Sequence, residues 1–90
     1  MTEPGEILLK RLRFRSWHRG TREMDLLLGR FADRYLDQLS PAQLRQYEAL
    51  LEVADADLYN WVTGQAPIPA GFDNDALRLI KNLNLSSSTS

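Results

Sequence analysis

The sequence predicts an all-α fold, a compact bundle of four to five short helices, on three observations. Apolar residues recur at the three- and four-residue spacing of a helix face, most regularly across residues 24–35. Serine, proline and glycine stand at positions typical of helix ends. No segment alternates apolar and polar residues over enough positions to form a strand. With only 90 residues, we expect one helical domain over residues 1–85 and a flexible Ser-rich tail over residues 86–90.

The first helix is expected over residues 7–18, which contain no helix breaker. Its apolar residues do not form one clean stripe. Placed on a helix, Leu12 shares a side with Arg15, whereas Ile7 and Phe14 lie on another side. Either the arginine stems cover apolar surface while their charged heads stay in water, or this helix presents a face that binds something acidic.

A charged turn is expected between the first two helices. Gly20 is predicted to end the first helix, because glycine adopts the left-handed conformation without a Cβ penalty. Thr21 is the predicted N-cap of the second helix, and Glu23 and Asp25 fall in its first turn, where negative charge opposes the helix dipole favourably. The second helix has the most regular apolar stripe, formed by Met24, Leu27, Leu28, Phe31 and Tyr35.

The third helix has the clearest start signal in the chain. Ser40 is the predicted N-cap, Pro41 the first helical residue, and Gln43 the partner that completes a capping box. Its buried side is predicted from the helical spacing of Leu44, Tyr47, Leu50, Leu51 and Ala54.

Two shorter helical segments are expected in the rest of the chain. Asp55 is predicted to cap a helix over residues 56–63 that Gly64 stops, and the proline-containing residues 65–71 read as an extended connection. Asp73 is predicted to open the last helix. The whole predicted core is Leu27, Leu28, Phe31, Leu44, Tyr47, Leu51, Leu58, Trp61, Leu77 and Ile80.

Composition excludes several classes of protein. The chain has no cysteine, and no apolar run approaches 18 residues, so neither a disulfide framework nor membrane insertion is expected. The acidic first residues do not resemble a targeting peptide. We therefore expect a bacterial cytoplasmic protein, or a mitochondrial matrix protein if the chain is a processed eukaryotic one. Residues 1–30 hold seven Lys and Arg against four Asp and Glu, which suggests a basic, partner-facing end.

The sequence offers little for catalysis, so we expect no enzyme activity and no metal site. His18 is the only histidine, and no nucleophile motif, phosphate-binding glycine loop or cluster at metal-ligand spacing is present. Asp55 and Asp57 are two residues apart and so do not share a helix face.

Binding is better supported, at the turn between the first two helices. Arginine offers a rigid fork of donors for carboxylates, phosphates or carbonyls, and glycine lets another backbone approach closely. An ordinary capped turn with solvated charges is the alternative interpretation. The candidate partner-binding residues are Arg15, Arg19, Gly20, Arg22, Glu23 and Asp25.

Nucleic acid is the rival partner. Residues 10–19 are basic with interleaved aromatic residues, as in many small helical DNA-binding domains. Against this, the isoelectric point of the chain is about 5.7, and the later helices contribute mostly acidic residues, which repel a phosphate backbone.

Three segments resemble the SdhE family, the small FAD assembly (flavinylation) factors of succinate dehydrogenase. Residues 19–25 are similar to the family motif Arg-Gly-x-x-Glu followed by a hydrophobic residue and Asp, with Thr21 and His18 departing from the commonest residues. Residues 35–40 resemble the family's link between its second and third helices. Residues 50–61 resemble its signature Leu-Leu-x-x-x-Asp-x-Asp-Leu-x-x-Trp.

The resemblance implies a helper protein. Family members bind the flavoprotein subunit of succinate dehydrogenase, and in bacteria also fumarate reductase, and promote covalent attachment of FAD to a histidine of that subunit. The chain would then hold no permanent cofactor, because the FAD and its histidine belong to the partner. Arg19 and Arg22 would contact the flavoprotein, Gly20 would permit close approach, and Glu23 would bind a cation or orient the arginines. We expect the free chain to be a monomer.

Overall fold

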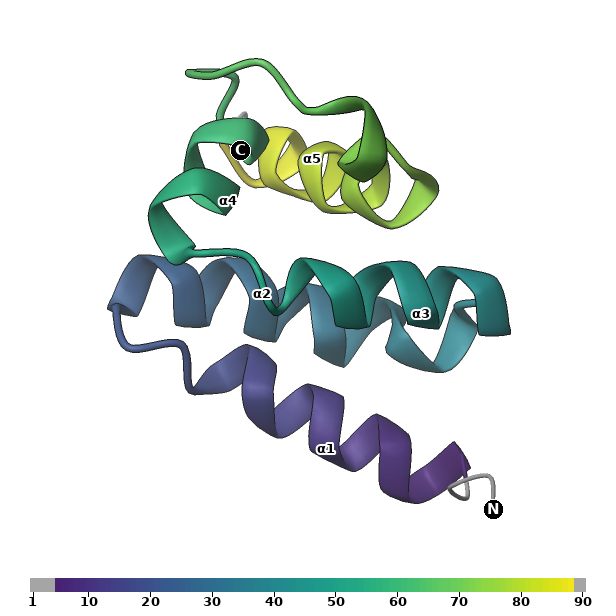
Figure 1. Cartoon of the computed structure of the whole chain (residues 1–90). Helices are drawn as coiled ribbons and strands as arrows, with labels where there is room; N and C mark the ends of the chain where they lie inside the picture. Colours follow the sequence, from purple (N-terminus) through teal and green to yellow (C-terminus); the bar gives the residue numbers. More distant parts are fainter. Residues whose placement is uncertain (1–4, 89–90) are drawn as a thin grey trace. The chain divides into compact units, whose positions relative to one another are not determined.

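The computed structural model describes residues 5–88, with side chains described up to Asn84. Within this range every regular element is helical and no strand occurs, which confirms the predicted all-α class (Figure 1). The chain divides into two compact units, one ending at Leu39 and the other beginning at Ser40. The elements are α1 (Gly5–Trp17), α2 (Arg22–Tyr35), the 3-10 helix η1 (Leu36–Gln38), α3 (Pro41–Leu50), α4 (Asp55–Val62), the 3-10 helix η2 (Ala70–Phe72) and α5 (Asp75–Ser88).

The first unit is built on α1 and α2, which run in opposite directions and pack on each other along their lengths (Figure 1). On α1 the fully buried residues are Leu12 and Ser16, and the Ser16 hydroxyl donates to the Leu12 carbonyl at 2.7 Å. A buried hydroxyl is costly unless it is hydrogen-bonded, and this bond within the helix satisfies it. The buried residues of α2 are Met24, Leu28, Gly29, Phe31 and Ala32.

A tryptophan is seated directly on a glycine where the two helices approach each other. A Cβ atom at Gly29 would overlap with ring atoms Cδ2, Cε2 and Cε3 of Trp17, so the absence of a side chain makes room for the indole. The indole Nε1 donates to Asp33 Oδ1 at 3.2 Å. Arg13 lies 3.4 Å from the carboxylates of both Asp33 and Asp37. These exposed ion pairs contribute little stability, so we attribute the pairing of α1 and α2 mainly to apolar contacts and to the packing of the Trp17 ring on Gly29.

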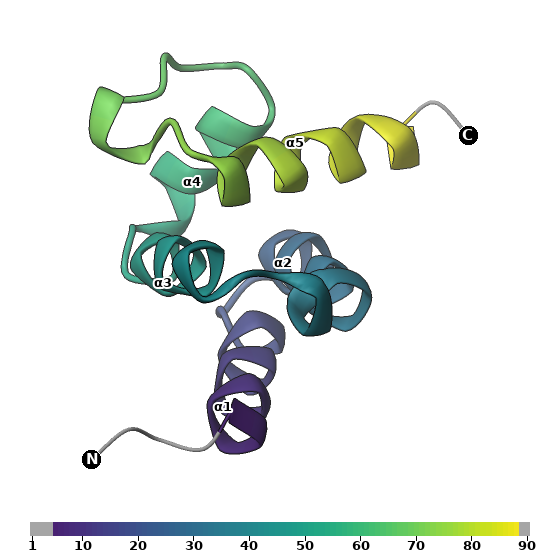
Figure 2. The same ribbon diagram turned by 90° about the vertical axis from the view of Figure 1, so that its right-hand side faces the viewer.

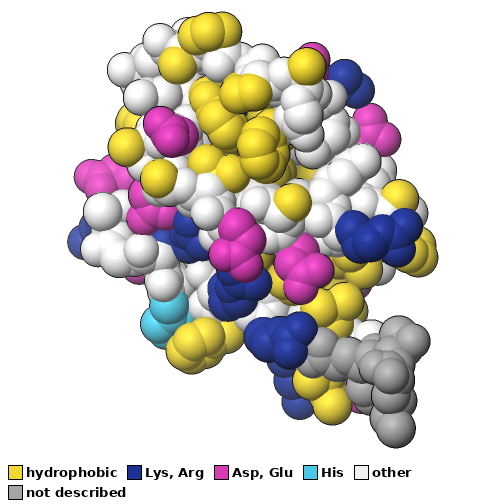
Figure 3. Space-filling view, viewed as in Figure 1, with side chains coloured by type: hydrophobic (Ala, Val, Ile, Leu, Met, Phe, Trp, Pro, Cys, Tyr) yellow, Lys and Arg dark blue, Asp and Glu magenta, His cyan; other side chains and the backbone are white. Residues whose placement is uncertain are grey.

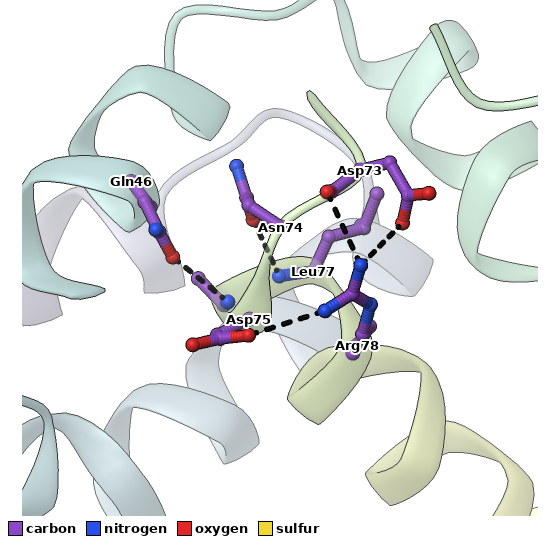
Figure 4. A network of polar contacts seen from close by, with 7 residues as sticks. Gln46, Asp73, Asn74, Asp75, Leu77 and Arg78 are labelled. Carbon is purple, nitrogen blue, oxygen red and sulfur yellow. Dashed lines mark hydrogen bonds and ion pairs between the residues drawn. The ribbon is translucent and has the colours of Figure 1, made fainter. Parts of the chain in front are cut away.

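The second unit begins with the predicted capping box. The Ser40 hydroxyl accepts from the Gln43 backbone N–H at 3.1 Å, and the Gln43 side chain accepts from the Ser40 backbone N–H at 2.9 Å. Within this unit α5 packs on both α3 and α4, as Figure 2 shows for α4. The start of α5 is held to α3 by Gln46, whose side-chain oxygen accepts from the Ala76 backbone N–H at 3.2 Å (Figure 4).

Two predicted caps are wrong by one residue. Ala54, not Asp55, is the N-cap of α4, because the Ala54 carbonyl accepts the first helical hydrogen bond, from Leu58 at 3.0 Å. At the start of α5 the side chain of Asn74 accepts from the Leu77 backbone N–H at 3.0 Å. Asp73 does not cap; its carboxylate lies 3.4 Å from Arg78, which also contacts Asp75 (Figure 4).

The predicted core is largely confirmed. Leu27 and Leu44 are half-buried and the other predicted core residues are buried, whereas Ala54, expected on the buried side of the third helix, is exposed. The backbone of α5 is helical through Ser88, where the sequence led us to expect a flexible tail from Ser86; residues 89–90 lie outside the described residues. Among residues 5–88, no helix combines the length and apolar character needed to cross a membrane.

Candidate functional site

Residues 19–23, which comprise most of the connection between α1 and α2 and the first two residues of α2, are called the elbow below. Thr21 is the N-cap of α2, as predicted: its backbone is extended, with φ −125° and ψ 150°, and its hydroxyl accepts from the Met24 backbone N–H at 3.3 Å. Its carbonyl accepts the first helical hydrogen bond, from Asp25, at 3.0 Å. The end of the elbow is therefore fixed by a threonine that satisfies an otherwise unpaired N–H of the new helix.

Gly20 gives the elbow its sharp bend. Its φ is +116°, a conformation that residues with a Cβ rarely adopt, and it is exposed. The last residue of α1 is Trp17, so Gly20 lies in the connection itself and not, as predicted, directly at the helix end. A Cβ placed on Gly20 would meet no atom of this chain within 4 Å. The glycine is thus required by the backbone angle, and the space beside it is open to another molecule.

The side chain of Asp25 links the elbow to α2 through a hydrogen bond. Its Oδ1 accepts from the backbone N–H of Arg19 at 2.6 Å, and the contact is part-buried. A hydrogen bond to an ionised carboxylate is stronger than one between neutral groups. Asp25 was expected to extend the partner-binding patch; the structure gives it a second role, closing the turn on α2. Nothing in the local sequence spacing singles out this contact between residues six positions apart.

The remaining predicted site residues differ in exposure. Arg22 and Glu23, in the first turn of α2, are exposed, whereas Arg15 and Arg19 are half-buried and both take part in interactions within the protein. Glu23 is favoured at this helix end by the helix dipole, but Arg22 is opposed by it. No carboxylate within the described range pairs with Arg22. Its charge therefore does not help to stabilise α2 and is presented to solvent.

The elbow offers exposed charged side chains and open space at Gly20 for binding. His18, next to it, donates from Nδ1 to the Phe14 carbonyl at 2.7 Å and stacks on the Phe14 ring. It is therefore an exposed, locally bonded side chain. Within residues 5–88, no group of three or more His, Cys, Asp or Glu side chains is placed to hold a metal ion.

Replacing Asp25 tests whether it shapes the elbow. Asp25→Ala removes the acceptor of the Arg19 N–H, and we expect it to lower the free energy of unfolding by about 1.5 kcal/mol, the scale of a hydrogen bond to a charged group. Asp25→Asn keeps an acceptor oxygen and should lose less than half of that. Urea unfolding followed by circular dichroism measures both. Equal losses for the two variants would show that the charge of Asp25, and not its hydrogen bond, supports the turn.

Comparison with known proteins places this chain in a family. Residues 10–84, which include the whole elbow, match the model of the family described as "flavinator of succinate dehydrogenase". The chain belongs to this family. It is 40% identical over 77 residues to "succinate dehydrogenase assembly factor 2, mitochondrial" of Dictyostelium discoideum, over 86% of this chain and 55% of that protein.

Two further relatives have the same level of identity to this member of the flavinator family. The assembly factor 2-B of Drosophila ananassae is 40% identical over 82 residues, which are 89% of this chain and 50% of the relative. The assembly factor 2 of Meyerozyma guilliermondii is 40% identical over 83 residues, which are 88% of this chain and 62% of the relative. The chain thus spans between half and two thirds of the length of these relatives, all of which are named mitochondrial.

Proposed function

We propose that this protein is an assembly factor that binds the flavoprotein subunit of succinate dehydrogenase and promotes its covalent flavinylation with FAD, and that it can also serve fumarate reductase. The observation that carries the proposal is the match of residues 10–84 to the flavinator family, with the elbow inside the matched range. The FAD is that of the flavoprotein, and this chain holds none permanently. Its compartment is the bacterial cytoplasm or, for a processed chain, the mitochondrial matrix.

The elbow suggests how such a helper acts. Covalent attachment requires the partner's histidine and its flavin to be held in reacting geometry, and a helper can favour that geometry by binding more tightly to the conformation that has it. Arg22 and Glu23 are exposed and can make charge-assisted contacts with the flavoprotein, while the open space at Gly20 lets its backbone approach. Arg19 and Arg15 support the same patch. The helper contributes binding, and the chemistry stays with the flavoprotein.

Nucleic-acid binding remains the alternative, and the structure makes it less attractive. A basic first helix needs free cations to neutralise phosphates. Arg13 in the middle of α1 instead lies between the carboxylates of Asp33 and Asp37, each 3.4 Å away. A DNA or RNA mobility shift that weakens steeply with salt would favour this alternative.

The deciding experiment is in-gel flavin fluorescence of the flavoprotein subunits. In cells that lack this protein, we expect the covalent flavin signal of the succinate dehydrogenase flavoprotein to fall at least tenfold, and complementation with the wild-type gene to restore it. Immunoblots for the same subunit control for its abundance. The fumarate reductase flavoprotein is scored in the same gels under anaerobic growth. A normal covalent flavin signal on both subunits without this protein, under every growth condition, would refute the proposal.

A further inference from the structure

The face of α1 turned away from its buried side carries two large exposed apolar residues. At about 100° per residue, residues 7 and 14 lie within about 20° of each other, roughly opposite the buried Leu12 and Ser16. Ile7 is 54% exposed and Phe14 is 63% exposed, although they are among the largest apolar side chains of the chain. We call the face formed by Ile7, Phe14 and the adjoining His18 the outer stripe.

Phe14 is held in place although it is exposed. Its ring stacks on His18 with the ring centroids 4.0 Å apart and the planes at 17°, and the Nδ1–H of His18 donates to the Phe14 carbonyl at 2.7 Å. Figure 3 shows the histidine of this chain lying against a hydrophobic side chain at the edge of the molecule. A side chain that is already ordered loses little conformational entropy on binding, as expected of a contact that contributes strongly to affinity.

The charges beside the outer stripe indicate the chemistry of its partner. Lys10 and Arg11 are exposed and flank the outer stripe on opposite sides, about 60° and 40° around the helix from Ile7. Arg11 also takes part in an interaction within the protein, and Glu6 is the one acidic residue of this helix. An apolar pair bordered by cations is complementary to a segment that combines carboxylates with an apolar side chain. The stripe also leads directly into the candidate site, since His18 precedes Arg19 of the elbow.

We propose that the outer stripe is a second contact surface for the flavoprotein subunit, which takes an acidic segment of that subunit whose apolar side chain seats on Phe14 and Ile7. This inference rests on the proposed function and extends it. The elbow and the stripe adjoin in the sequence at His18 and Arg19, and the proposed contact surface runs from the N-terminal part of α1 to the first turn of α2. Its apolar half supplies buried area that the charged elbow lacks.

Binding of the purified flavoprotein subunit, measured by isothermal titration calorimetry with the full chain, tests the stripe. We expect Phe14→Ala and Phe14→Gln each to raise the dissociation constant about tenfold or more, without lowering the melting temperature, because the ring is mostly exposed. Lys10→Glu should weaken binding more strongly at low salt than at high salt. The matched control is Tyr59→Ala, which removes an exposed aromatic residue of α4 and should leave the affinity unchanged.

The outcomes separate the two proposals. If the wild-type chain binds the flavoprotein and both Phe14 variants bind it equally well, the outer stripe is not a contact and the proposed function still stands. If the wild-type chain does not bind, the proposed function and this inference both fail. A last experiment measures binding to vesicles of phosphatidylglycerol and phosphatidylcholine. If the wild-type chain binds these vesicles, and Phe14→Ala abolishes that binding but leaves flavoprotein binding unaffected, the stripe binds an anionic lipid surface and the inference is overturned.

Discussion

Gly20→Arg is expected to weaken binding of the flavoprotein subunit by more than a hundredfold while the helical content stays that of the wild type. The φ of +116° makes any side chain here cost about 1–2 kcal/mol of backbone strain. The surroundings add no clash, because no atom of this chain lies within 4 Å of an added Cβ. A long cationic side chain would instead occupy the space through which the partner approaches the elbow. Calorimetry with the purified flavoprotein and circular dichroism of the free variant measure the two effects.

Gly20→Ala is the matched control, because it introduces the same backbone strain with almost no bulk. We expect the two variants to lose similar stability and to differ strongly in affinity, with Gly20→Ala retaining most of its binding. Comparable affinities for the two would mean that the bend alone matters and that no partner approaches closely at Gly20. An unfolded Gly20→Arg protein beside a folded Gly20→Ala protein would contradict the open surroundings described for this residue.

Gly29→Ala is expected to destabilise the protein by about 1–3 kcal/mol, the usual cost of forcing an extra group into a packed interface. The sign of this change in the free energy of unfolding is informative. In the middle of an exposed helix the same substitution would stabilise by about 0.5–1 kcal/mol, because alanine loses less backbone freedom than glycine. Here the new methyl group would overlap with the ring of Trp17. Urea unfolding gives the free energy difference directly.

A double-mutant cycle with Trp17 identifies the cause of that loss. In a Trp17→Ala background the indole is gone, and Gly29→Ala should become neutral or stabilising, even though Trp17→Ala alone is destabilising. Gly71→Ala is the control, because no atom lies within 4 Å of a Cβ added at Gly71 and the new methyl group therefore overlaps with nothing. If Gly29→Ala stabilises the wild-type chain, the indole does not sit on Gly29 and the packing described for α1 and α2 is wrong.

The helix starts that depend on neighbouring residues were predictable from the sequence. Thr21 caps α2, and Ser40 forms its reciprocal pair with Gln43, because both arrangements need only a suitable side chain three residues from its partner. The predictions failed where two adjacent residues could start the same helix. Asp73 and Asn74 both carry side chains that can cap α5, and the cap rules do not choose between them. In the structure Asn74 caps the helix, while Asp73 pairs with Arg78 five residues further along the chain.

The turn that carries the candidate site was predicted in position but not in detail. Gly20 and the charges around it mark a turn that any helix-end rule can locate. That the carboxylate of Asp25 reaches the Arg19 backbone, or that Trp17 needs a glycine at position 29, depends on how the chain folds back on itself. The irregular apolar pattern of the first helix corresponds to a feature of the structure. Leu12 is buried, whereas Phe14 is exposed, so α1 presents an apolar side chain to solvent.

The two tryptophans of the chain fall one in each compact unit. Trp17 is half-buried and hydrogen-bonded to Asp33, whereas Trp61 is buried and its ring lies 5.3 Å from that of Phe72. Each unit thus contains its own intrinsic fluorophore, in a different environment. Single-tryptophan versions of the protein can report separately on events at either side of Leu39, and the emission of Trp17, three residues from Gly20, gives docking at the elbow an optical signal that needs no added dye.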